Sequence, residues 1–184
     1  MGFVDENVDI VQLPKATFYH HGNNQKWVTD VTEFRLFVQN LYLSPILDLC
    51  SRDIVTYTIS DSPNLRMVTT MLEQTFQKIP DNTGLLLHLD QSWRYQHMQY
   101  KKRLEEKGVK QSMTRKGNCY DNSVMENFFG HLKSELLNLQ EFNSVEHFIA
   151  ELIDYIDYYN NRRIKARRKG LPPALHRQQA LSAA

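Results

Sequence analysis

Three acidic residues occupy positions where a folded core is expected to be apolar. Asp90 ends an apolar run, Asp30 interrupts a strand-like segment, and Glu126 lies on an amphipathic stretch 36 positions after Asp90 (126 − 90). Carboxylates placed together in a core repel one another and lose hydration, so they are tolerable mainly if cations hold them together. The three positions therefore predict a metal site that acts on phosphate.

The composition limits the classes of protein that could carry such a site. With 184 residues, 41% hydrophobic and 23% charged, the chain suits one globular domain with some additional length. No apolar run approaches the roughly 20 residues needed to cross a bilayer, and we expect a cytoplasmic, nucleoid-associated protein. Cys50 and Cys119 lack the spacing of a zinc site or a disulfide framework.

Hydrophobic periodicity predicts the elements that must position the acids. Alternating and continuous apolar runs indicate strands, and apolar residues at helical spacing indicate helices. The predicted order is strands at 26–34, 41–49 and 54–59, a helix at 65–79, a strand at 85–89, a helix at 95–107, a strand at 109–113, and helices at 122–137 and 145–159. Asp90 thus follows a buried parallel strand, and Glu126 lies on a helix.

Three segments of the chain, Gln25–Phe34, His88–Gln91 and Gly117–Phe129, carry a resemblance to a known family. They resemble the catalytic domain of bacterial insertion-sequence transposases of the second-frame (OrfB) type, which are related to retroviral integrases. The resemblance covers about residues 23–175. It implies an α/β, ribonuclease-H-like fold, with a five-stranded mixed sheet whose first three strands are antiparallel and with helices on both faces.

The resemblance also implies which residues act. The family has an Asp, Asp, Glu triad with 35 residues between the last two acids, and here the interval is 35 residues (126 − 90 − 1). It also has a basic residue seven positions after the glutamate, which here is Lys133. The implied catalytic and metal-binding residues are therefore Asp30, Asp90 and Glu126.

The chemistry of phosphodiesters explains these residue types. Two Mg²⁺ or Mn²⁺ ions roughly 4 Å apart can activate an attacking oxygen and neutralise a leaving oxygen during in-line displacement. We expect Asp30 to bridge both ions, and Asp90 and Glu126 to hold one ion each. Water would first free a 3′-hydroxyl at the end of the element, and this hydroxyl would then attack target DNA.

Basic residues are expected to contact the DNA. The stretch 161–170 contains six basic residues and no acid, so phosphate contact and simple solvation both stay open for it. The predicted contacts are Arg115, Lys116, Asn122, Lys133, Arg162, Arg163 and Lys165. The expected partners are the ends of an insertion sequence, a target duplex and further copies of the chain in a homodimer or higher oligomer.

Each candidate also has a structural interpretation. Ser123 and Glu126 fit a helix capping box, Asp90 could form a turn at a strand end, and Asp30 could pair with a nearby lysine or arginine. His88 is interpreted as a strand histidine rather than a ligand, because Mg²⁺ prefers oxygen. The joint pattern of the three acids favours the catalytic interpretation.

The chain also departs from the family pattern. Where such proteins commonly read His-Ser-Asp-Gln-Gly, this chain has Leu89 and Ser92, and a positive φ at Ser92 would displace Asp90. Residues 1–22 are interpreted as a remnant of an N-terminal region without its helix-turn-helix segment, residues 23–175 as the catalytic core, and residues 176–184 as a tail.

Two functions from different classes follow from these observations. One is a metal-dependent transposase of the polynucleotidyl transferase class, which cleaves 3′ ends and transfers strands, with activity reduced by truncation. The other is a catalytically impaired, DNA-binding or dimerising remnant. A nuclease of the same fold is a third possibility, because hydrolysis and strand transfer differ only in the attacking oxygen.

Overall fold

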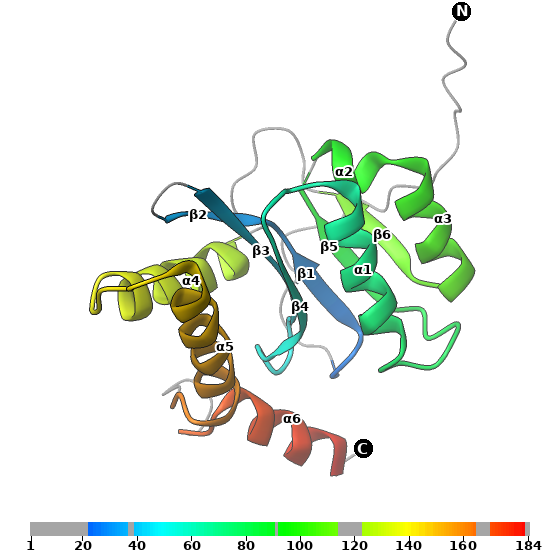
Figure 1. Cartoon of the computed structure of the whole chain (residues 1–184). Helices are drawn as coiled ribbons and strands as arrows, with labels where there is room; N and C mark the ends of the chain where they lie inside the picture. The colour runs from blue at the N-terminus through cyan, green and yellow to red at the C-terminus, as the bar shows by residue number, and fades with distance from the viewer. Residues whose placement is uncertain (1–21, 37–38, 91, 114–122, 165–169, 183–184) are drawn as a thin grey trace, which may run out of the picture.

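The computed structural model describes residues 22–36, 39–90, 92–113, 123–164 and 170–182 (Figure 1). The strands are β1 (Lys26–Thr29), β2 (Thr32–Leu36), β3 (Gln39–Asp48), β4 (Ile54–Ser60), β5 (Leu86–Leu89) and β6 (Lys110–Met113). The helices are α1 (Leu65–Phe76), α2 (Trp93–Gln96), α3 (Met98–Lys107), α4 (Ser123–Leu132), the π-helical turn η3 (Lys133–Leu137), α5 (Val145–Asn161) and α6 (Pro173–Ser182). None of the described helices is both long and apolar enough to cross a membrane.

All six described strands belong to one mixed sheet. Its order across the width is β4, β3, β1, β5, β6, and β2 pairs with the far part of β3. β1 is antiparallel to β3 and parallel to β5, and β5 is parallel to β6. The expected antiparallel first strands and parallel later strands are confirmed.

The segment predicted as one strand at 26–34 is two strands that share one register. The partner pairs Thr29–Ile46 and Thr32–Leu43 continue a single antiparallel ladder along β3. Continuing that register places Asp30 opposite Pro45, which has no backbone N–H to donate. The ladder is interrupted there, so six strands occupy the five positions expected across the sheet.

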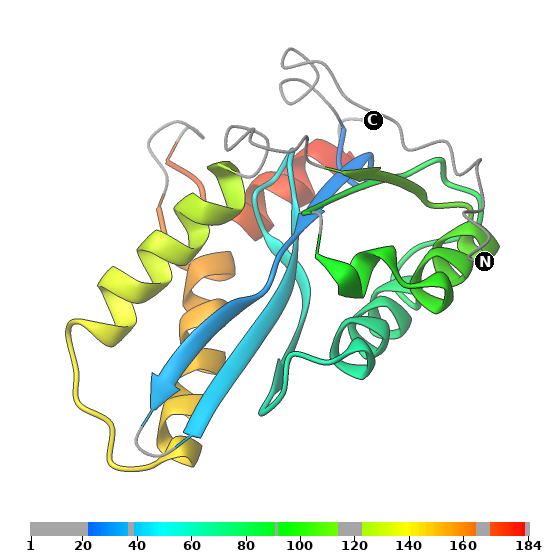
Figure 2. The ribbon, with the colours of Figure 1, turned by 90° about the horizontal axis from the view of Figure 1, so that it is seen from above.

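Helices cover both faces of this sheet, as the sequence predicts. In Figure 2, α1 and α3 lie on one side of the strands and α4 and α5 on the other. The neighbours Trp27 and Val28 of β1 pack into different clusters, Trp27 with α1 to α3 and Val28 with α4 and α5. This alternation is the period of two expected of a strand that is buried on both faces.

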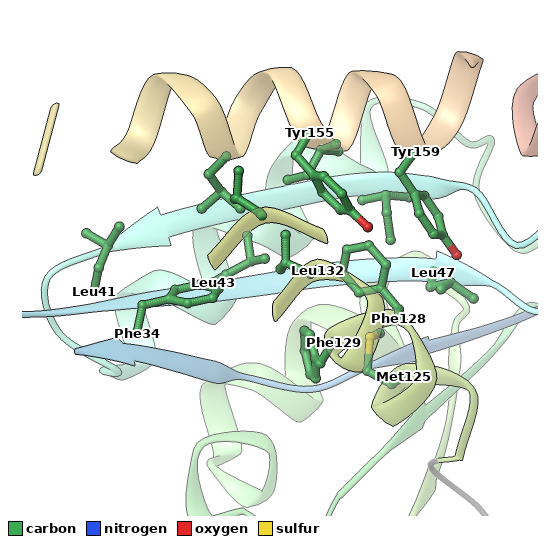
Figure 3. Packing of buried hydrophobic residues seen from close by; sticks show 14 of the residues in the cluster. Phe34, Leu41, Leu43, Leu47, Met125, Phe128, Phe129, Leu132, Tyr155 and Tyr159 are labelled. Carbon is green, nitrogen blue, oxygen red and sulfur yellow. The ribbon is translucent and has the colours of Figure 1, made fainter. Parts of the chain in front are cut away.

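The face toward α4 is filled by aromatic and aliphatic side chains. Figure 3 shows Phe128, Phe129 and Leu132 of α4 lying over the strands, in the same cluster as residues of α5. The ring of Phe128 meets that of Tyr159 edge to face, with 4.8 Å between centroids. Aromatic contacts of this kind stabilise beyond the buried area alone, so this contact holds α4 against α5.

The helix α6 was not predicted, since no helix was expected after residue 159. Proline is favoured at the first position of a helix, and α6 begins at Pro173. Arg177 of α6 donates to both carboxylate oxygens of Asp53, at 2.9 and 3.0 Å, and also bonds Asn24. The boundary predicted between 175 and 176 thus falls inside a docked helix, while the division of the chain into a remnant, a core and a tail stays a prediction.

Candidate active site

Asp30 and Asp90 lie at one edge of the sheet. Asp30 follows the last residue of β1, and Asp90 follows the last residue of β5. β1 and β5 are parallel neighbours, paired through Val28 and His88. Adjacent strands are roughly 4.8 Å apart, so the two backbones that carry these acids are side by side.

The side chains of both acids are expected on the face of the sheet that α4 covers. Thr29 and Leu89, which precede them, face α1: the Thr29 hydroxyl lies 3.7 Å from the Met71 sulfur, and Leu89 packs in the same cluster as Met71. Successive strand side chains point to opposite faces. The alternation therefore directs Asp30 and Asp90 to the α4 side.

Local hydrogen bonds fix both carboxylates. The N–H of Val31 donates to Asp30 Oδ1 at 2.7 Å, and the N–H of Ser92 donates to Asp90 Oδ1 at 3.0 Å. Ser92 has φ −61°, so this position does not need the left-handed conformation that favours glycine. Serine there does not displace Asp90.

A buried tyrosine feels the charges of both acids, and it was not singled out from the sequence. Tyr95 of α2 is fully buried, and no hydrogen bond to its hydroxyl forms among the described residues. Burial raises the pKa of Tyr95, and the negative charges of Asp30 and Asp90 raise that pKa further. Both carboxylates thus lie close enough to act on one phenol.

Glu126 lies in the first turn of α4 and is exposed. It follows Met125, which packs in the same cluster as Val28 of β1. Within the part of the chain that the structure describes, no three His, Cys, Asp or Glu side chains are close enough together to hold a metal ion. The structure thus brings Asp30 and Asp90 together and leaves Glu126 on the neighbouring helix, so the complete triad stays a prediction.

The predicted DNA contacts lie in different settings. Arg115, Lys116, Asn122 and Lys165 fall outside the described residues, as does most of the proposed N-terminal remnant. Lys133 is exposed at the start of η3. Because Glu126 and Lys133 are joined by α-helical backbone, seven residues bring them to a common face.

The two described arginines of the basic stretch have acidic partners. Arg162 is exposed, lies 3.3 Å from the Asp157 carboxylate, and stacks over the Tyr158 ring at 5.7 Å. Arg163 is half-buried against Glu135. Phosphate contact by either residue stays a prediction.

The structural interpretation of His88 is confirmed. It is buried in β5, with Nδ1 3.1 Å from the Ser112 hydroxyl of β6. This contact crosses two parallel strands and stabilises the part of the sheet that ends in Asp90.

Comparison with known proteins defines the class. The integrase core domain family matches over residues 20–119, and a second match to an integrase core domain covers residues 126–181. The catalytic core of HTLV-2 integrase in complex with magnesium has a similar fold, with a TM-score of 0.67 at 12% identity over 85% of this chain and 97% of that one. The core of BIV integrase gives a TM-score of 0.65 at 17% identity, over 87% of this chain and 97% of the other. The ribonuclease-H-like fold class is therefore confirmed.

The bacterial relatives place the chain within that class. It is 47% identical over 156 residues to the putative transposase InsK of insertion element IS150 from Escherichia coli, covering 85% of this chain and 55% of the relative. It is 43% identical over 159 residues to a transposase-like protein of Haemophilus influenzae, covering 86% and 73% of the two chains. The chain belongs to the integrase core domain family, among the bacterial insertion-sequence transposases. It spans about half the length of the InsK protein.

Proposed function

We propose that the protein is a DNA transposase core that cleaves the 3′ ends of an insertion sequence and joins them to target DNA by in-line attack on phosphodiesters. The observation that carries the proposal is the pairing of Asp30 and Asp90 at the ends of neighbouring parallel strands. Two carboxylates this close repel each other unless a cation lies between them.

The donor set fits magnesium. Carboxylate oxygens are the hard ligands that Mg²⁺ prefers, and few of them suffice because the ion keeps several waters. Asp30 and Asp90 would hold two ions between them, and Glu126 would complete the site from α4. When bound, Mg²⁺ supplies Lewis-acid activation of the attacking and leaving oxygens.

The protein's own residues orient the carboxylates and bind the DNA phosphates. Asp30 accepts a hydrogen bond from the backbone N–H of Val31, and Asp90 accepts one from that of Ser92, which restricts the orientation of both carboxylates. Lys133, on the face of Glu126, would bind a phosphate beside the scissile bond and set the direction of approach. DNA ends, a target duplex and further copies of the chain are the proposed partners.

The test is joining of a pre-cleaved oligonucleotide to a target duplex in Mn²⁺. The natural chain should give joined product, while Asp30→Asn and Asp90→Asn should each give none. Asp154→Asn, an exposed acid on α5, serves as the matched control and should join normally. Absence of metal-dependent product from the natural chain, or equal product from Asp90→Asn, would exclude the catalytic role.

A second candidate is a DNA-binding remnant without catalysis. It is favoured by one observation: among the described residues, Glu126 does not come together with Asp30 and Asp90. This function predicts duplex binding by the natural chain with neither cleavage nor joining. The same gel assay, run beside a binding assay, separates the two candidates.

A further inference from the structure

Arg163 lies in the stretch predicted to bind DNA, yet its guanidinium is held by the protein itself. Its Nε donates to both carboxylate oxygens of Glu135, at 3.1 and 3.0 Å, and its Nη2 donates to Oε1 at 2.6 Å. Only 16% of the Arg163 side chain is exposed. A guanidinium that is bound to both oxygens of one carboxylate is fixed in direction as well as position.

Glu135 is held by further contacts. The Tyr155 hydroxyl donates to Glu135 Oε2 at 3.0 Å, and Nδ1 of His131 lies 3.5 Å from Glu135 Oε1 and 3.3 Å from Arg163 Nη2. The guanidinium also lies over the Tyr159 ring, 6.0 Å from its centroid. These five residues, which we call the Glu135 clamp, join the end of α4, the turn η3 and the end of α5.

Two residues of the clamp, His131 and Glu135, lie on the same continuous helix as Glu126 and Lys133. α4 and η3 run without a break from Ser123 to Leu137, so Glu126, Lys133 and Glu135 belong to one helical rod. The rod changes from α to π geometry at Lys133, and π turns are rare and occur frequently at functional sites. Arg163 is thereby tied to the rod that carries Glu126.

We propose that Glu135 is a positioning residue for DNA binding, because it holds Arg163 and so fixes the chain at the end of α5, including the neighbouring Arg162, against η3. The inference rests on the proposed function and deepens it. It gives Arg163 the role of an anchor, in place of the phosphate contact predicted from the sequence. Arg162, with 62% of its side chain exposed, is the described residue of the stretch that suits a phosphate.

The substitution Glu135→Gln should change the affinity for DNA in opposite directions, depending on whether Glu135 acts only through its charge or positions Arg163. Glu135→Gln removes a negative charge, so electrostatics alone would tighten binding to a polyanion. If Glu135 positions the basic stretch, the same change weakens binding, and Arg163→Gln weakens it equally. The exchanged pair Glu135→Arg with Arg163→Glu restores the contact and should recover most of the affinity.

The experiment measures binding of the full chain to a fluorescent duplex oligonucleotide by anisotropy, over a range of KCl concentrations. We expect Glu135→Gln and Arg163→Gln each to lower the affinity by roughly tenfold, as the loss of one well-placed contact does. Glu151→Gln, which makes the same change of charge in the same surface groove between η3 and α5, is the matched control and should bind as tightly as the natural chain or tighter. Arg162→Gln should reduce the salt slope by about one unit.

Equal or tighter binding by Glu135→Gln would overturn the positioning role. Thermal unfolding of the same variants separates this role from the proposed function, because it measures the contact without DNA. In one outcome, the unfolding temperatures show that Glu135 and Arg163 stabilise the fold jointly while the natural chain binds no duplex. In that case the proposed function fails, and the positioning role fails with it. If the natural chain binds the duplex and Glu135→Gln leaves binding unchanged, only the positioning role is excluded.

Discussion

Asp30 and Asp90 each stand two residues beyond the paired residues Val28 and His88 of neighbouring parallel strands. This common offset brings two acids that are far apart in the chain to one edge and one face of the sheet. The pairing of β1 with β5, rather than any contact between the side chains, creates the candidate metal site.

The repulsion between these two acids should be measurable. Without metal, Asp30→Asn or Asp90→Asn should raise the free energy of unfolding by up to about 1 kcal/mol, because like charges on adjacent strands destabilise a sheet. Mg²⁺ should raise the unfolding temperature of the natural chain and not that of either variant, since a ligand stabilises only the state that binds it. Thermal unfolding with and without MgCl₂ measures both effects. Asp154→Asn should keep the full response to Mg²⁺, and an equal response in Asp90→Asn would count against the site.

The end of α5 is joined to the edge strand β4 by one side chain. The Asn160 carboxamide accepts from the Ile54 N–H at 2.8 Å and donates to the Ile54 carbonyl at 3.0 Å. Asn160→Ala should lower the free energy of unfolding by about 2 kcal/mol, because both backbone groups lose their partner. Asn161→Ala, at an exposed neighbour, should stay within about 0.5 kcal/mol of the natural chain. Urea unfolding of the two variants makes the comparison.

The Glu135 clamp should depend on pH. Hydrogen bonds from Arg163, aided by that from Tyr155, hold the pKa of Glu135 below its ordinary value of 4.5, although burial opposes them. A carboxylate with a lowered pKa stabilises the fold fully above its ordinary value, and this stabilisation is lost as the pH falls through the folded-state pKa. Glu135→Gln should therefore cost about 1–2 kcal/mol at neutral pH and progressively less below pH 4.5. Urea unfolding across this range tests the sign, and a difference that grows on acidification would contradict it.

Two glycines should respond to alanine in opposite directions. Gly108 ends α3 with φ +72°, and an added Cβ would lie 2.7 Å from the Asn82 Cα. Gly108→Ala should therefore destabilise by more than about 1 kcal/mol. Gly130 lies within α4 with no atom near its Cβ position, so Gly130→Ala should stabilise by roughly 0.5–1 kcal/mol. Denaturant midpoints of the two variants provide the measurement, and a loss of stability in Gly130→Ala would show that α4 tolerates no side chain there.

Local patterns predicted most of the helices and strands, because the spacing of apolar residues along one element reflects which of its faces is buried. The alternation of residues 26–34 predicted the strand that the structure divides into β1 and β2, and the apolar run 85–89 predicted β5. The break at Asp30 could not be seen locally, since it depends on Pro45 in another strand. The helix α6 had a local signal in Pro173, a favoured first helical residue, but no helix was predicted there.

The candidate site was predictable to a similar extent. Strand ends and spacing pointed to Asp30 and Asp90, whose proximity follows from the sheet. The contact between Glu135 and Arg163 spans 28 residues, and no periodicity reports such a pair. The sequence therefore indicates that Arg163 is basic without showing that the fold already uses its charge.

The docking of Arg177 has a consequence for how the core is connected to anything attached to it. Arg177 bonds Asn24 and its carbonyl accepts from Asn23, so the entry into β1 and the helix α6 are fastened together. Asp30 lies at the other end of β1. A fusion partner joined ahead of Gly22 or after α6 would thus attach near the start of β1, a strand's length away from Asp30, so tethering at either place should leave the edge that carries Asp30 and Asp90 accessible.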